Sequence, residues 1–123
     1  MKRFLPYSRQ SIDAKDIKKV TSILKKDFIT QGPQIESFER VFAKYVGSKF
    51  AVACATGTAA LHLACQALNL KPGGKLLTTP ITFVASANCA QFVGADTYFA
   101  DIDLKNYCIS PTHLEVELKK EKV

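Results

Sequence analysis

The chain has 123 residues and a net charge of +6, and 47% of its residues are hydrophobic and 23% charged. This composition indicates a globular protein and excludes a disordered one, and the length fits one small domain or part of a larger one. No run of 18 apolar residues occurs, so no membrane span and no membrane partner are predicted.

Charge and cysteine usage narrow the classes of partner. The lysines are scattered over predicted helix faces and do not interleave with aromatic residues, so no nucleic-acid partner is expected. Cys54, Cys65, Cys89 and Cys108 form no C-x-x-C pair and have no spacing that suits zinc, so no metal site is predicted. The first three lie in apolar runs and are expected to be small buried side chains. We expect free thiols and a cytoplasmic protein.

The first 49 residues read as an arm followed by two helices. Residues 1–12 are expected to be extended. Asp13 is placed to cap a helix over 13–26, with Asp16 as its partner in a capping box. After a loop, a second helix is predicted over 34–46, and Gly47 is placed to end it.

In the remainder, short apolar runs alternate with segments whose apolar residues are spaced as on one face of a helix. This pattern predicts an α/β fold. The predicted strands are 50–54, 75–79 and 96–100, and the predicted helices are 58–69, 84–93 and 111–120. Because short connections join strand to helix to strand, the three strands are expected to be parallel, with flanking helices. Ligands of such sheets bind at the carboxyl ends of the strands.

The turn Thr56-Gly57-Thr58 follows the first predicted strand and opens a helix. Free backbone N–H groups and the helix dipole favour an anion there, which suits a single phosphate group. An equally simple interpretation is a plain turn with a threonine cap. No G-x-G-x-x-G and no G-x-x-x-x-G-K-[ST] occurs, which argues against a dinucleotide or nucleoside triphosphate. Phe83 follows the second predicted strand and offers an aromatic ring nearby.

Five segments in register resemble the start of the DegT/StrS-type nucleotide-sugar aminotransferases, which are fold-type-I enzymes that use pyridoxal 5′-phosphate (PLP). The segments are residues 7–10, 30–33, 55–64, 79–88 and 101–103. The resemblance implies an arm and first helix over 1–32, and the N-terminal portion of the PLP-transferase large domain, incomplete, over 33–123. It also implies a homodimer, a nucleotide-sugar substrate and an amino-acid donor, with glutamate expected as the donor. The expected activity is transamination of a keto-sugar nucleotide in surface polysaccharide or pseudaminic acid biosynthesis.

The resemblance also implies roles for individual residues. Gly57, Thr58 and Ala59 match the turn that holds the cofactor phosphate, and Phe83 matches the aromatic residue that stacks on the pyridine ring. The residues that match the substrate-facing arm and loop are Tyr7, Asp27, Phe28, Ile29 and Thr30. Ala55-Thr56 stands where the family more often has Ser-Asn, so a side-chain contact from that position is not expected. His62 is interpreted as a packed helix residue.

No catalytic residue is assigned, because the Schiff-base lysine and the carboxylate on the pyridine nitrogen are expected beyond this chain. Two Ser-x-x-x-Lys patterns, ending at Lys15 and Lys26, lie in or beside the first predicted helix and are interpreted as chance. Asp101 and Asp103 match a structural Asp-Ile-Asp. The first hypothesis is therefore an N-terminal fragment of an aminotransferase that is inactive alone. The alternatives are a non-catalytic phosphate or nucleotide-sugar binding module and a basic interaction protein.

Overall fold

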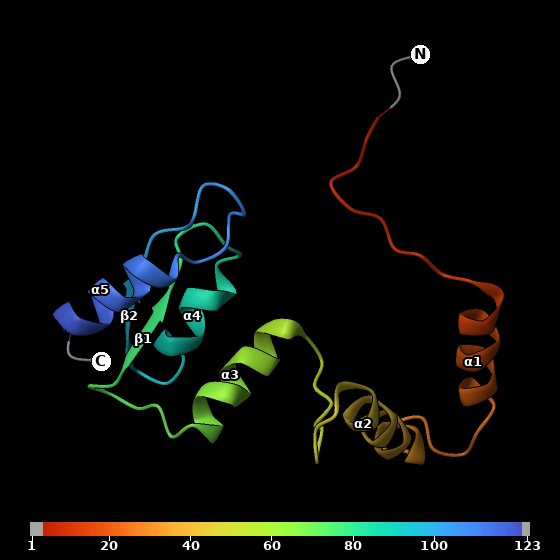
Figure 1. Cartoon of the computed structure of the whole chain (residues 1–123). Helices are drawn as coiled ribbons and strands as arrows, with labels where there is room; N and C mark the ends of the chain where they lie inside the picture. Colours follow the sequence, from red (N-terminus) through yellow and green to blue (C-terminus); the bar gives the residue numbers. More distant parts are fainter. Residues whose placement is uncertain (1–3, 122–123) are drawn as a thin grey trace. The chain divides into compact units, whose positions relative to one another are not determined.

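The computed structural model describes residues 4–121 of the chain, which forms two compact units, Met1–Ala53 and Cys54–Val123 (Figure 1). Each unit has its own secondary structure and is described separately. No helix within residues 4–121 is both long enough and apolar enough to cross a membrane.

The first unit contains helices α1 (Ala14–Leu24) and α2 (Pro33–Val46). The capping box at the start of α1 is confirmed: Asp13 Oδ1 accepts from the N–H groups of Lys15 and Asp16 at 2.7 and 3.0 Å, and Asp13 N–H donates to Asp16 Oδ2 at 2.9 Å. Gly47 ends α2 in the left-handed region, at φ 72°, as its position predicted. Both helices are therefore bounded by local signals in the sequence.

The second unit contains α3 (Gly57–Ala67), β1 (Lys75–Thr78), α4 (Ala85–Gln91), β2 (Asp96–Phe99) and α5 (Pro111–Glu121). The two strands are parallel neighbours, with Lys75 opposite Asp96 and Thr78 opposite Phe99. Helix α4 connects them, and it packs against both strands and against α3. The α/β fold and the parallel sense of these strands are confirmed, and the predicted helix ends agree to within about two residues, the usual uncertainty.

The first of the three predicted strands, 50–54, is wrong. These residues form no strand, and Phe50 and Val52 are exposed. A strand needs a neighbour for its N–H and C=O groups, and no described residue pairs with this run in a ladder. Ala53 N–H donates instead to the Glu39 carboxylate, at 2.7 Å. Apolar β-prone residues predict the extended conformation, but the pairing depends on segments elsewhere.

The buried part of the described chain consists almost wholly of small side chains. Its buried hydrophobic residues are Ala43, Cys65, Ala85, Cys89, Ala90, Ala95, Ala100 and Ile102. Small residues on one face of α4 let this helix approach the sheet and α3 closely. Cys65 and Cys89 are buried as predicted, whereas Cys54 is exposed, because the run that contains it forms no strand.

Candidate functional site

The turn that opens α3 is held by its first threonine. Thr56 is the N-cap residue, and its Oγ1 accepts a hydrogen bond from Ala59 N–H at 3.1 Å. Its carbonyl oxygen accepts from Ala60 N–H at 3.0 Å, the first hydrogen bond of the helix. The capping role that the sequence predicted for a threonine is therefore present, and the Ala59 N–H already has a partner within the chain.

Two backbone donors at this turn remain available. The N–H groups of Gly57 and Thr58 donate to no described residue. They lie at the N-terminus of an 11-residue helix, where the dipole places roughly half a positive charge. Unpaired donors and a positive helix end together favour an anion with several oxygen acceptors, and a phosphate group is such an anion.

The space around Gly57 is open. A Cβ atom built at this position would meet no atom within 4 Å, and the residue is not in the left-handed region. Neither packing nor backbone conformation within the described chain therefore requires glycine here. A missing side chain beside two free N–H groups leaves room for a group from outside to approach the backbone closely. Thr58 is half-buried, and no described residue bonds its hydroxyl.

Phe83 stands in the loop between β1 and α4. Its carbonyl oxygen accepts from Ser86 N–H at 3.0 Å, and Thr82 and Ser86 share a hydrogen bond of 3.3 Å between their hydroxyls. The backbone at Phe83 is thus tied to the first turn of α4, while its side chain is 74% exposed. In Figure 1, β1 and α3 run in opposite senses, so the loop after β1 and the first turn of α3 face the same end of this unit.

The residues assigned to the substrate-facing arm all lie in the other unit. Tyr7 is fully exposed, and Phe28 and Ile29 are 72% and 59% exposed. Asp27 and Thr30 are exposed as well. Loop 27–30 begins three residues after α1 and leads into Gly32, the N-cap of α2.

Asp101 and Asp103 use their carboxylates on the local backbone. Asp101 Oδ1 accepts from Ile102 N–H at 2.8 Å, and Asp103 Oδ1 accepts from Lys105 N–H at 2.7 Å. Ile102 and Ile109 form an isolated antiparallel bridge that closes this loop. These contacts agree with the structural role expected for Asp-Ile-Asp. Within residues 4–121 no group of three His, Cys, Asp or Glu side chains is placed to hold a metal ion.

His62 has a buried ring nitrogen that could not be predicted from residue types or spacing. Its ring packs against Phe92, with centroids 5.3 Å apart, which agrees with its interpretation as a packed residue. Its Nε2 atom, however, is buried without a hydrogen-bond partner among the described residues. His62 lies one turn after Thr58 on α3, so the two residues share a face of the helix.

The buried thiols of Cys65 on α3 and Cys89 on α4 contact each other through a hydrogen bond. Burial raises the pKa of the Cys65 thiol above its usual range, and a hydrogen bond with Cys89 raises this pKa further. Both effects disfavour the thiolate, which is the nucleophilic form. This pair therefore belongs to the packing of the unit.

The comparisons with known proteins agree with this arrangement. The sequence profile of the DegT/DnrJ/EryC1/StrS aminotransferase family matches residues 10–122. The chain belongs to this family. Its relatives include the spore coat polysaccharide biosynthesis protein SpsC of Bacillus subtilis, which is 43% identical over 112 residues. That match covers 91% of the chain and 29% of SpsC.

Solved structures of aminotransferases share the fold of this chain. The putative sugar aminotransferase Spr1654 of Streptococcus pneumoniae, in its PLP form, superposes with a TM-score of 0.84 at 28% identity and covers 91% of the chain. PseC of Helicobacter pylori, an aminotransferase of pseudaminic acid biosynthesis, superposes with a TM-score of 0.84 at 30% identity and covers 90%. The chain spans 29% of the Spr1654 structure and 30% of the PseC structure.

Residues of this chain suit PLP, the cofactor present in a solved form of Spr1654. Solved forms of Spr1654 with PLP and with its amine counterpart imply PLP for the family. The two free N–H groups at Gly57 and Thr58 suit a phosphate, and the exposed ring of Phe83 suits a flat heteroaromatic group.

Proposed function

We propose that the chain supplies the phosphate-binding part of a PLP-dependent nucleotide-sugar aminotransferase. The observation that carries this proposal is the first turn of α3, where the N–H groups of Gly57 and Thr58 have no partner among the described residues and a Cβ atom at Gly57 would meet nothing within 4 Å. The Thr58 hydroxyl adds a third donor, and Ala59 contributes by keeping the turn in its capped conformation. Family membership supports PLP as the phosphate monoester that binds there.

Within this proposal Phe83 and the helix turn act on different ends of the cofactor. Phe83 packs against the ring and fixes its tilt, and α3 fixes the phosphate. Bound PLP supplies an electron-withdrawing ring while an amino group passes between a donor amino acid and a keto-sugar nucleotide. Tyr7, Asp27, Phe28, Ile29 and Thr30 face the nucleotide sugar. No lysine or carboxylate of this chain is assigned to the chemistry, so the 123 residues alone are expected to be inactive.

The finer substrate assignment is also a proposal. We place the protein closest to the transaminase that makes UDP-4-amino-4,6-dideoxy-N-acetyl-β-L-altrosamine, with glutamate as amino donor. Similarity to PseC, an aminotransferase of pseudaminic acid biosynthesis, and to SpsC, a protein of spore coat polysaccharide biosynthesis, supports this class of substrate. A cytoplasmic homodimer is the form in which we expect it to act.

A titration of the chain with PLP, followed by absorbance, tests the proposal. A charge-assisted hydrogen bond contributes about 1.5–3 kcal/mol, so Thr58→Ala should weaken PLP binding by roughly tenfold to a hundredfold. Ring contacts contribute about 0.5–1.5 kcal/mol, so Phe83→Leu should weaken it less. Thr112→Ala is the matched control, because Thr112 is an exposed threonine in the first turn of another helix, α5.

Competition with inorganic phosphate separates the two interpretations of the turn. Phosphate should displace PLP from the parent and from Phe83→Leu, and less effectively from Thr58→Ala. If the parent and Thr58→Ala bind PLP with equal affinity, the turn is only a helix cap and does not bind the phosphate. If phosphate binds as tightly as PLP and Phe83→Leu changes neither affinity, the non-catalytic phosphate-binding module is the better description.

A further inference from the structure

Two side-chain contacts hold α3 against α4 in the second unit. The rings of His62 and Phe92 have centroids 5.3 Å apart. The thiols of Cys65 and Cys89 share a hydrogen bond. Cys65 follows His62 by three residues on α3, and Cys89 precedes Phe92, the C-cap residue of α4, by three as well. Because residues three apart are neighbours on a helix surface, the ring contact lies beside the thiol contact and restricts how far the two sulfur atoms can separate.

Both thiols are shielded from solvent among small side chains. Cys65 and Cys89 are 5% and 2% exposed, and Ala85 and Ala90 on α4 are buried as well. A disulfide bond is about 2.05 Å long, so the two sulfur atoms must come closer than a hydrogen bond holds them. The short side chains of the two alanines leave the backbone of α4 free to approach α3.

A covalent bond at this contact would restrict a long segment of the chain. The segment between the two cysteines contains β1 and the loop of Phe83. Closing such a segment into a loop lowers the conformational entropy of the unfolded chain and thereby stabilises the folded state. The bond would also join α3, which begins at Gly57, to α4, which follows Phe83.

We propose that Cys65 and Cys89 form a disulfide with a peroxide as the oxidant, and that this bond stabilises the packing of α3 on α4. The thiolate of one cysteine attacks a peroxide oxygen, the O–O bond breaks, and the departing hydroxide takes up the thiol proton as water. The second sulfur then attacks the sulfur of the resulting sulfenic acid. The S–S bond forms, the S–O bond breaks, and a second water leaves with the second thiol proton. The two thiols thus lose two electrons and two protons, and hydrogen peroxide gains them.

The environment of the pair makes this reaction slow at neutral pH. Burial raises the pKa of the Cys65 thiol, and the thiolate is the form that attacks the peroxide. The thiolate fraction grows as the pH rises, so the disulfide should form faster in alkaline solution. The proposal is independent of the proposed cofactor site, because the reaction needs only the two thiols and the peroxide.

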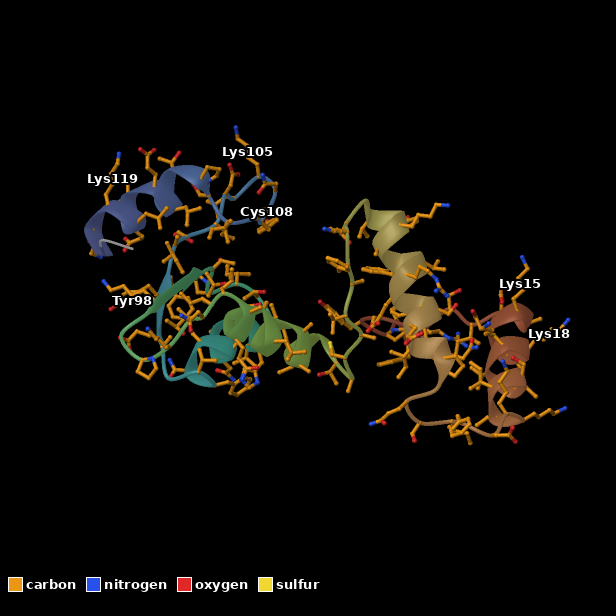
Figure 2. All side chains as sticks on the ribbon, turned by 90° about the horizontal axis from the view of Figure 1, so that it is seen from below. Lys15, Lys18, Tyr98, Lys105, Cys108 and Lys119 are labelled. Carbon is orange, nitrogen blue, oxygen red and sulfur yellow. The ribbon has the colours of Figure 1, made fainter. Side chains whose placement is uncertain are left out.

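The two other thiols of the chain are removed for the test. Cys54 and Cys108 are exposed, and Figure 2 shows Cys108 in the loop before α5, apart from α3 and α4. Exposed thiols react with peroxide without a neighbouring partner and can join two molecules. Cys54→Ser with Cys108→Ser leaves the buried pair as the only thiols of the chain.

Peptide mapping of this double variant after treatment with hydrogen peroxide tests the proposal. Trypsin cuts after Lys75, so Cys65 falls in peptide 50–75 and Cys89 in peptide 76–105. Without reduction, the two peptides should be recovered joined, and dithiothreitol should separate them. The joined product should form several times faster at about pH 9 than at about pH 7.

Thermal melting measures the effect of the bond on the fold. The oxidised double variant should melt about 5–10 °C above its reduced form. Cys89→Ala in the same background is the matched control, and peroxide should not raise its melting temperature. Cys65→Ala makes the same test from α3. Each protein is compared with its own reduced form, so any loss of packing from the alanine affects both measurements equally.

Three outcomes would overturn the proposal. The first is a sulfinic or sulfonic acid at either cysteine with no joined peptides, which would show that the second thiol cannot reach the first. The second is a pair of thiols that stays unmodified at alkaline pH. The third is a joined product whose melting temperature equals that of the reduced protein, since the bond would then not stabilise the packing of the two helices.

Discussion

Different interactions stabilise the two units of the chain internally. In Cys54–Val123 a parallel strand pair, α4 and α3 pack around small residues, and Ala90 and Cys89 are 0% and 2% exposed. In Met1–Ala53 helix α1 buries no residue, and Ala43 is the buried hydrophobic residue of α2. The first unit thus depends on helix caps and tight turns, whereas the second depends on close packing. Matched substitutions in the two units should therefore reduce stability by different amounts.

The largest effect is expected from overpacking the second unit. Ala90→Leu places a larger side chain where no exposed area remains, and overpacking a dense site costs about 1–3 kcal/mol or more. Ala14→Leu makes the same chemical change at the exposed first residue of α1 and should cost less than about 0.5 kcal/mol. Urea unfolding followed by circular dichroism measures both. Equal midpoints for the two variants would show that the second unit is not closely packed.

Local signals in the sequence were sufficient to predict where the helices begin and end. Asp13, Gly47 and Pro111 each act within one turn, and α1, α2 and α5 begin or end beside them. The strand at 50–54 could not be predicted in the same way, because a strand depends on a partner that is distant in the sequence. The burial of Cys54 was inferred from that strand and failed with it.

The candidate site was predictable to a similar extent. The cap at Thr56 follows from residue types, and so does a helix N-terminus at Gly57. That the Ala59 N–H is engaged while those of Gly57 and Thr58 are free depends on the conformation of the turn.

Two glycines allow the same backbone effect to be compared in both units. Gly47 and Gly94 have φ of 72° and 74°, so replacing either with alanine costs about 1–2 kcal/mol in backbone strain. A Cβ at Gly47 meets nothing within 4 Å, whereas one at Gly94 lies 3.0 Å from Pro72 Cγ. Gly94→Ala should therefore destabilise the chain more than Gly47→Ala, by the additional cost of moving Pro72. Thermal melting of both variants measures the difference. A larger decrease in melting temperature for Gly47→Ala than for Gly94→Ala would contradict this prediction.

The smallest effect, and the most local, is expected at the cap of α1. Asp13→Ala removes the acceptor for two N–H groups and should cost about 0.5–2 kcal/mol. Because α1 buries no residue, little packing opposes its fraying, so the loss should appear in this helix alone. Hydrogen exchange should rise for the amides of residues 15–24 and stay unchanged for those of α4. Asp13→Asn is the matched control, since asparagine caps nearly as well as aspartate. If exchange rises equally in α4, the two units unfold together and the distinction between caps and packing fails.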